Sequence, residues 1–450
     1  MPITRRIAAI AAAAAITALM AGCSAGTPSS ASTSDSSSGP TQAQIDKAMS
    51  KPTTISFWSW VPDIQNEINL FEKKYPNIKV ELQNQGGATA QYQKLRASIK
   101  SGNVPDVAQI EYSFLPSFTL TKSVLNLAPY GFDKYKKDYS ASAWTQVSSG
   151  SSVWGLPQDL GPTGLLYRND LLQKAGVQPP ATWDEFAKDA KTVKDTTGAY
   201  LTDLPGNSFS PILALMWQAG AQPFAYDGKK TVTIDLQSAK VKKVVSYWND
   251  LIKQGLVSTD PQLDDNWYQQ MSNGSYVSWL AAAWGPVFLQ GTAANTAGLW
   301  RAAPMPQWST SNRASGNQGG SADVVMAGSK HAIAAAQFVK FLNSDTSSTD
   351  MLAEKQFLFP SLKATQNDSA FRNQKLDFYG GQTVNSQFVD IAGTVSPKWQ
   401  WLPFNDFASS SFKETLGAAI TQKDDLMPAL SKWQGQLVQY AEQQGFTVKK

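Results

Sequence analysis

The sequence predicts an α/β protein with more than one domain. A chain of 450 residues is longer than a single hydrophobic core usually supports, so its length indicates two or three domains. Segments with strand and helix patterns alternate over residues 53–111, in the order strand, helix, strand, helix, strand. This alternation is typical of a parallel β-sheet covered by helices.

The elements of this first region follow from the spacing of its apolar residues. In the strand predicted over residues 53–60, Ile55 and Phe57 share one face. Trp58 and Trp60 share the opposite face. The next predicted elements are a helix over residues 64–75, a strand over 78–82, a helix over 92–99 that Gly102 ends, and a strand over 104–111.

A polar bend at residues 158–162 interrupts the middle of the chain. One strand is predicted just before it and another over residues 165–167. Gly176 is predicted to end the following helix, because glycine adopts the positive φ that a helix C-terminus often needs. Thr182 and Glu185 then form a capping box that opens another helix. Later helices are predicted over residues 210–217, 238–254, 267–271, 332–342, 413–420 and 428–443, with a strand over 276–280.

The composition excludes several classes of function. The net charge is only +4, and no basic run interleaves with aromatic residues, so nucleic acid is not expected as a partner. One cysteine and one histidine exclude an intramolecular disulfide bond and a zinc site built from these residues. We therefore expect no metal and no cofactor. His331 is interpreted as an exposed residue at the start of a helix.

Residues 1–22 are predicted to be a secretory signal peptide. An arginine pair precedes an apolar run over residues 7–20, which is short for a membrane span and typical of a signal. The segment ending at Cys23 resembles a bacterial lipoprotein box, with Met20 where that pattern prefers leucine. The resemblance implies that Cys23 is acylated; the alternative is an incidental thiol. Residues 23–50 are then expected to be a flexible, lipid-anchored tether.

Two stretches of the chain resemble one known family. FEKKYPNIKVEL and YQKLRASIKSGNVPDVAQIE, within residues 71–111, and the whole stretch 154–191 resemble the sugar-binding proteins that feed ABC importers. These form family 1 of the extracellular solute-binding proteins, which includes the maltose-binding proteins. The resemblance extends from residue 53 to the C-terminus. It is strongest before residue 194 and weakest over residues 361–396.

This resemblance implies a two-lobed periplasmic-binding-protein fold of type II. Each lobe is expected to contain a parallel sheet, and a hinge of several crossings, near Asp159, Ser321 and Pro360, is expected to join the lobes. The implied N-lobe comprises residues 51–158 plus 322–360. The implied C-lobe comprises residues 159–321 plus 361–450.

The candidate ligand residues lie mainly where strands end. Ligands of open parallel sheets bind beyond the carboxyl ends of the strands. That rule selects Trp58, Trp60 and Glu111, and the first crossing contributes Gln158 and Asp159. Matches to the family motifs add Asn207 and Trp284, and the Pro-flanked loop PKWQWLPF adds Trp399 and Trp401.

Side chains of these types suit a sugar ligand. A pyranose has an apolar face that stacks on an aromatic ring, and hydroxyl groups that bond to carboxylates and amides. Tryptophan pairs spaced by two indicate more than one sugar ring. The alternative is that each tryptophan is a core residue, and that Glu111 and Asp159 are ordinary surface or hinge carboxylates. Five other tryptophans are assigned to packing: Trp154, Trp183, Trp217, Trp248 and Trp267.

Two classes of function remain open. The resemblance implies a non-catalytic, monomeric binding protein, lipid-anchored on the outer face of the cytoplasmic membrane, which delivers an oligosaccharide to the permease subunits of an ABC transporter. The alternative is a secreted hydrolase that uses Glu111 and Asp159 as its two carboxylates. A further alternative keeps the fold and changes the solute to one that is not a sugar.

Overall fold

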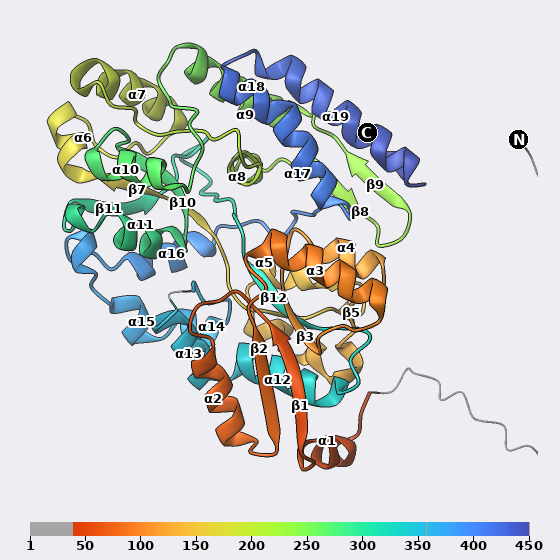
Figure 1. Cartoon of the computed structure of the whole chain (residues 1–450). Helices are drawn as coiled ribbons and strands as arrows, with labels where there is room; N and C mark the ends of the chain where they lie inside the picture. Colours follow the sequence, from red (N-terminus) through yellow and green to blue (C-terminus); the bar gives the residue numbers. More distant parts are fainter. Residues whose placement is uncertain (1–38, 357, 450) are drawn as a thin grey trace, which may run out of the picture. The chain divides into compact units, whose positions relative to one another are not determined.

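Two central β-sheets organise the computed structural model, which describes residues 39–356 and 358–449 (Figure 1). The first sheet has the strand order β2-β1-β3-β12-β6 and the second the order β10-β7-β11. The parts of the chain around them are named the first lobe and the second lobe. The strands are β1 (Thr53–Trp58), β2 (Ile78–Gln83), β3 (Val107–Glu111), β6 (Leu156–Pro157) and β12 (Ser321–Val325), then β7 (Thr163–Arg168), β10 (Ser278–Ala282) and β11 (Trp300–Pro304). The predicted signal peptide and Cys23 lie outside the described residues.

Helices and two small sheets, with the strand orders β13-β9-β8 and β4-β5, surround these sheets. The helices are α1 (Gln42–Met49), α2 (Gln65–Lys74), α3 (Ala88–Ser101), α4 (Leu115–Leu120), α5 (Ala141–Val147), α6 (Asn169–Ala175), α7 (Trp183–Thr197), α8 (Ser210–Gln218), α9 (Ala239–Lys253), α10 (Asp265–Asn273), α11 (Gly285–Thr292), α12 (Ala332–Ser344), α13 (Thr346–Glu354), α14 (Lys363–Gln366), α15 (Ser369–Asn373), α16 (Val384–Ala392), α17 (Asn405–Glu414), α18 (Leu416–Gln422) and α19 (Leu426–Gln443). The short strands are β4 (Ser148–Ser149), β5 (Ser152–Val153), β8 (Phe224–Tyr226), β9 (Thr231–Ile234) and β13 (Thr447–Lys449). The helix predicted over residues 413–420 is interrupted at Thr415, between α17 and α18.

The first sheet confirms the alternation predicted over residues 53–111. β1 pairs in parallel with β2 and with β3, and α2 and α3 form the connections. Ile55 and Phe57 are completely buried, and the ring of Phe57 meets Phe338 of α12 edge-on, with 5.2 Å between centroids. β12 pairs antiparallel with β3, because it enters the sheet from the opposite direction on its return from the second lobe.

The second sheet is antiparallel at its centre, so the expectation of a parallel sheet in both lobes is wrong. β7 pairs antiparallel with both β10 and β11. The reason is the path of the chain: β7 leaves the hinge, whereas β10 ends beside it, with Ala282 opposite Thr163. Parallel pairing does occur nearby, at the isolated bridge between Asp203 and Ser258.

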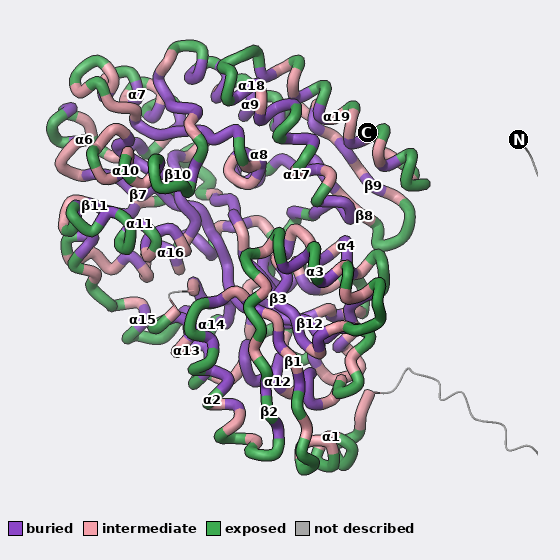
Figure 2. Tube along the Cα trace, viewed as in Figure 1, coloured by how far each residue is buried: buried purple, intermediate pink, exposed green. Residues whose placement is uncertain are grey.

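Two buried clusters form the core. The first includes Phe57 of the first sheet and continues to Trp279 and Phe388 on one face of the second sheet. The second cluster covers the other face. Figure 2 shows buried backbone along the central strands and exposed backbone on the outer helices. Because the first cluster passes from one sheet to the other, the exact lobe limits stay a prediction. Of the tryptophans assigned to packing, Trp154 is partly buried, and four are buried: Trp183, Trp217, Trp248 and Trp267.

Three crossings join the sheets, and they lie side by side. An antiparallel bridge joins Asp159 of the first crossing to Pro360 of the third, and another joins Pro162 to Asn317 of the second. Backbone hydrogen bonds of 2.7–3.0 Å connect them. The first crossing therefore runs between the other two, close to the predicted positions at Asp159, Ser321 and Pro360.

Residues 42–49, which belong to the stretch 23–50 predicted to be a flexible tether, form helix α1 instead. The hydroxyl of Thr41 accepts a hydrogen bond from the N–H of Gln44 at 3.3 Å, and the Gln44 side chain accepts one from the N–H of Thr41 at 2.7 Å. This reciprocal capping box satisfies two backbone donors that a helix start would otherwise leave unpaired. The helix packs against α12.

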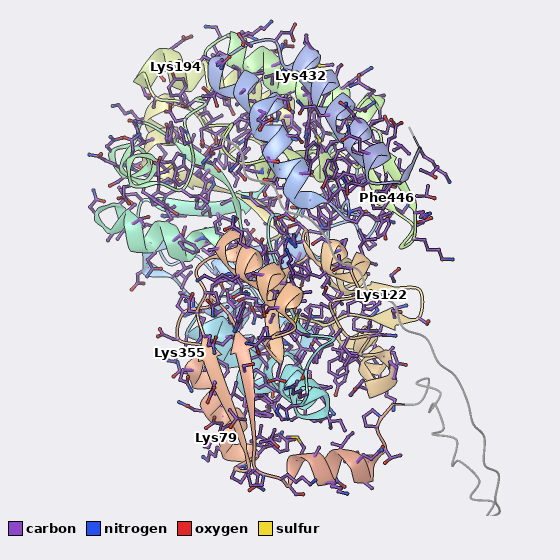
Figure 3. All side chains as sticks on the ribbon, turned by 45° about the vertical axis from the view of Figure 1, so that its right-hand side comes forward. Lys79, Lys122, Lys194, Lys355, Lys432 and Phe446 are labelled. Carbon is purple, nitrogen blue, oxygen red and sulfur yellow. The ribbon has the colours of Figure 1, made fainter. Side chains whose placement is uncertain are left out.

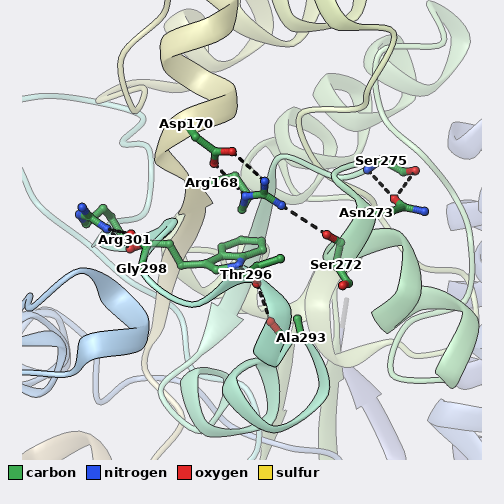
Figure 4. Close-up of polar contacts among 10 residues, drawn as sticks. Arg168, Asp170, Ser272, Asn273, Ser275, Ala293, Thr296, Gly298 and Arg301 are labelled. Atoms are coloured by element: carbon green, nitrogen blue, oxygen red, sulfur yellow. Dashed lines mark hydrogen bonds and ion pairs between the residues drawn. The ribbon is translucent and has the colours of Figure 1, made fainter.

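A buried arginine closes the end of the second sheet that is remote from the hinge (Figure 4). The guanidinium of Arg168 pairs with the Asp170 carboxylate through contacts of 2.7 and 2.8 Å. It also donates to the carbonyl of Ser272 at 3.5 Å and lies 5.9 Å from the centroid of the Trp300 ring. The indole N–H of Trp300 donates to the Thr296 hydroxyl at 2.8 Å. Arg168 thus fastens β7, α10 and β11 together.

Most lysine side chains of the described residues lie at the surface. Lys79, Lys122, Lys355 and Lys432 are exposed and point outward (Figure 3). His331 is exposed directly before α12, as predicted. Within residues 39–356 and 358–449, no helix combines the length and the apolar character needed to cross a membrane.

Candidate functional site

Trp58 and Trp60 stand at the carboxyl end of β1, and both are partly exposed. Two glutamines hold the backbone that carries them. The carbonyl of Trp58 accepts from the Gln91 amide at 3.4 Å, and the N–H of Trp60 donates to the Gln109 side chain at 3.3 Å. The Trp60 ring also meets Tyr92 edge-on, with 6.1 Å between centroids. The first sheet therefore presents two aromatic side chains on a fixed backbone.

Glu111 ends β3 beside Tyr92. The backbone N–H of Glu111 donates a hydrogen bond to the Tyr92 hydroxyl at 2.7 Å. The Tyr92 hydroxyl in turn donates to the Glu111 carboxylate at 3.4 Å. Burial, together with the negative charge of Asp159, raises the pKa of Glu111 to about 7. The side chain can therefore carry or release a proton near neutral pH.

Asp159 and Gln158 are adjacent on the first crossing, and both are buried. Oδ1 of Asp159 accepts from the N–H of Ser321 at 2.9 Å and from its hydroxyl at 2.6 Å. Burial raises the pKa of Asp159 to about 6, although these hydrogen bonds oppose the rise. The Gln158 amide donates to Asp323 at 2.9 Å. This bond turns Gln158 into the first lobe, so the structure places it inside the hinge rather than at a ligand surface.

Trp284 lies on the other side of the hinge, directly after β10, and is partly exposed. Its indole N–H donates to the carbonyl of Gln318 on the second crossing at 3.0 Å. Its ring meets Trp279 and Phe288 edge-on, at 5.8 and 5.7 Å between centroids. The second lobe therefore presents an aromatic ring whose position is set by the hinge itself.

Asn207 is exposed and follows the segment that bridges to Ser258. Its side chain makes two hydrogen bonds of 3.3 Å with the backbone of Gln262, donating to the carbonyl and accepting from the N–H. With both of its functional groups engaged in this way, Asn207 positions the loop that carries Gln262.

The structure places Trp399 and Trp401 in the core rather than at a ligand surface. Trp399 is 2% exposed and stacks on Trp217, with centroids 4.9 Å apart and the rings 5° from parallel. Trp401 is buried, and its indole N–H donates to Gln146 of α5 at 2.8 Å. The loop folds inward because Trp217, which was assigned to packing, provides an apolar face for both rings.

Several residues near the hinge escaped the sequence analysis. Tyr92 is the first residue of the helix predicted over residues 92–99, and its hydroxyl accepts a hydrogen bond from the N–H of Glu111. Arg96 of α3 forms an ion pair with Asp406 of α17. This ion pair connects the two lobes. No local pattern signals a contact between residues so far apart in the sequence. Among the described residues, no three His, Cys, Asp or Glu side chains gather in a way that could hold a metal ion.

Two lobes, three adjacent crossings and partly exposed tryptophans on both sides of the hinge define a two-lobed solute-binding protein. Ligands of open parallel sheets bind beyond the carboxyl ends of the strands, which is where Trp58 and Trp60 of the first lobe lie. Residues 53–348 match the family model described as bacterial extracellular solute-binding protein, and the chain belongs to this family.

Known proteins of similar sequence and structure agree with this assignment. The lactose-binding protein of Rhizobium radiobacter is 26% identical over 361 residues, covering 75% of this chain and 81% of that protein. The arabinooligosaccharide-binding protein of Bacillus subtilis is 24% identical over 385 residues, covering 82% and 87%. The solved structure of an ABC transporter associated binding protein from B. animalis subsp. lactis Bl-04, in complex with beta-1,6-galactobiose, is 30% identical with a TM-score of 0.78, covering 88% of this chain and 99% of that chain. The fold is that of the type II periplasmic binding proteins.

Proposed function

We propose that this protein is the binding component of an ABC importer and captures a sugar or oligosaccharide between its lobes. The observation that carries the proposal is the presence of partly exposed tryptophans on both sides of the hinge: Trp58 and Trp60 on the first lobe and Trp284 on the second. A ligand that stacks on rings of both lobes favours the closed arrangement, because it gains contacts that the open one lacks. The sugars in the names of the similar proteins support this class of ligand.

Glu111 and Asp159 serve this function as hydrogen-bond partners for sugar hydroxyl groups. Carboxyl groups form stronger hydrogen bonds than neutral groups, of roughly 1.5–3 kcal/mol each when charged. The protein is proposed to be non-catalytic, since the family and the similar proteins are binding proteins. The bonds from Ser321 to Asp159 also engage one oxygen of this carboxylate, which suits a fixed binding group better than a nucleophile.

The family and the N-terminal sequence support a proposed location outside the cytoplasm. The family is extracellular, and the segment ending at Cys23 resembles a lipoprotein box. The protein is thus a lipid-anchored monomer on the outer face of the cytoplasmic membrane, where it delivers its ligand to the permease subunits.

Calorimetric titration with a panel of soluble solutes tests the proposal. The panel contains β-1,6-galactobiose, lactose, arabinobiose and arabinotriose, together with a peptide and a polyamine. We expect saturable binding of at least one sugar and no release of reducing ends after prolonged incubation. Binding of the peptide or the polyamine alone would assign another solute, and accumulating reducing ends would favour the hydrolase alternative.

A further inference from the structure

A small pocket lies at the hinge-side edge of the second sheet, outside the predicted set of ligand residues. It is lined by the first residue of β7, by β10, by the second crossing and by the loops that carry Asp203 and Gln262; the lining includes Thr163, Asp203, Gln262, Leu280, Met305 and Gln318. Its free space is about that of one water molecule or one hydroxyl group. The pocket combines apolar walls with a few polar groups, as specificity pockets do.

Asp203 is the only carboxylate among the residues that line this pocket. The residue is 2% exposed. Its Oδ2 accepts a hydrogen bond from the indole N–H of the fully buried Trp267 at 3.1 Å, which fixes the orientation of the carboxylate. Its Oδ1 is buried and makes no well-formed hydrogen bond within the protein, although the Gln262 side chain lies close enough to interact with the carboxylate. A buried polar atom is seldom left unpaired in a native protein, so this oxygen is available for a partner from outside.

The charge state of Asp203 fits such a role. Burial raises the pKa of Asp203 to about 7, and the side chains of Gln262 and Trp267 oppose the rise. Near neutral pH the Asp203 carboxyl group therefore exists both in its charged form, which accepts hydrogen bonds, and in its protonated form, which can also donate one.

The pocket adjoins the predicted ligand surface of the second lobe. Gln318 lines the pocket, and its backbone carbonyl accepts the indole N–H of Trp284 at 3.0 Å. Gln262 is positioned by its two backbone hydrogen bonds to Asn207. A sugar ring stacked on Trp284 would therefore lie beside a pocket that offers the Asp203 carboxylate and the amides of Gln262 and Gln318.

We propose that this pocket is a specificity pocket in which Asp203 accepts a hydrogen bond from one hydroxyl group of the sugar. The inference rests on the proposed function. A hydroxyl group fits because it donates to Oδ1 of Asp203 and accepts from a neighbouring amide at the same time. A methyl group in this position would leave the carboxylate unpaired, and an anionic group would be repelled by it.

The substitution Asp203→Asn tests the proposal. Asparagine has the same shape and can still accept the Trp267 hydrogen bond through its oxygen, but it then presents an NH₂ group to the pocket. We expect at least a ten-fold loss of affinity for the best-binding disaccharide of the panel, measured by calorimetry, with an unchanged or higher melting temperature. Unchanged affinity would overturn the proposal and leave the pocket as the site of a bound water.

Glu67→Gln is the matched control. Glu67 is also a buried carboxylate with one bonded oxygen and one unpartnered oxygen, but it lies on α2 in the first lobe, away from the pocket. Its replacement is expected to leave affinity unchanged. An equal loss of affinity in both variants would show a general effect of removing a buried charge and would overturn the proposal.

Monodeoxy derivatives of the same disaccharide provide a second test that needs no variant to fold. For the wild-type protein, removal of one particular hydroxyl should cost at least ten-fold in affinity. In Asp203→Asn the same deoxy sugar should lose no further affinity, because the partner is already gone. Additive losses for every deoxy derivative would overturn the proposal while the proposed function stands. Failure of the wild-type protein to bind any sugar of the panel would overturn both.

Discussion

At the scale of single residues, exposure divides the predicted ligand tryptophans into two groups. Trp58 and Trp284 are partly exposed at opposite sides of the hinge, whereas Trp399 is covered by protein and stacked on Trp217. A covered ring contributes to stability through its buried area and its stacking. A partly exposed ring at a binding edge contributes less to stability and is free to contact a ligand.

This division makes a paired prediction. Trp58→Ala and Trp284→Ala should each weaken binding of the best sugar by ten-fold or more, about 1.4 kcal/mol, without unfolding the protein. Trp399→Ala should instead lower the free energy of unfolding by about 3–5 kcal/mol, because it leaves a cavity. Calorimetric titration and denaturant unfolding measure the two effects. A stable Trp399→Ala protein with lost affinity would return this residue to the binding site.

At the scale of elements, the hinge depends on close approach of its crossings. Gly161 of the first crossing lies so near the second that a Cβ atom would stand 1.9 Å from the carbonyl oxygen of Gln318. A side chain cannot occupy this space unless the backbone moves. Glycine is therefore required here by packing rather than by an unusual φ angle.

Gly161→Ala should push the first and second crossings apart and destabilise the protein by roughly 1–3 kcal/mol or more. Gly291→Ala is the control, because a Cβ atom at Gly291 in α11 meets nothing within 4 Å. This second change should stabilise the protein by roughly 0.5–1 kcal/mol, since alanine favours a helix over glycine. Urea unfolding measures both. Equal stability of the two variants would contradict the observed spacing of the crossings.

At the scale of the whole molecule, buried carboxyl groups determine how stability depends on pH. Burial raises the pKa of five of them, to about 6 for Asp159 and to about 7 for Glu67, Glu111, Asp203 and Asp323. In the unfolded chain these groups titrate near their ordinary values, about 4. Between about pH 4 and 7 the folded protein therefore binds more protons than the unfolded chain.

Stability should consequently fall as the pH rises through this range. We expect a higher melting temperature at pH 5 than at pH 8, measured by calorimetry in buffers of equal ionic strength. Asp323→Asn should make the melting temperature depend less on pH. The substitution removes a buried carboxyl group of β12 whose pKa is about 7 in the folded protein and near its ordinary value in the unfolded chain. A melting temperature that rises from pH 5 to pH 8 would contradict the prediction.

The proposed lipid anchor also acts on the whole molecule. Wild-type protein should partition with membranes, because two or more acyl chains hold more firmly than the marginal attachment of one. Cys23→Ala should release the protein into the soluble fraction, with sugar affinity unchanged. Fractionation and immunoblotting measure the partition. A variant that stays with the membrane would contradict acylation at Cys23.

Local features of this protein could be predicted from the sequence because short-range interactions determine them. The alternation of Ile55 and Phe57 in β1 and the capping box of Thr182 and Glu185 are present in the structure as predicted. Gly176 ends α6 with a φ of 70°, also as predicted. In each case the partners lie within a few residues of one another, so sequence spacing determines their geometry.

Only the tertiary structure decided the direction of the second sheet, the fate of Trp399 and the role of Asp203. Whether β7 runs with or against β10 depends on the path through the hinge, and Trp399 is buried because Trp217 lies beside it. Asp203 becomes a candidate ligand group because Trp267 engages one of its oxygens and a pocket surrounds the residue. The sequence by itself determined the family, the elements and the aromatic ends of the strands. It could not determine which side chains remain free, because that depends on residues brought together from distant parts of the chain.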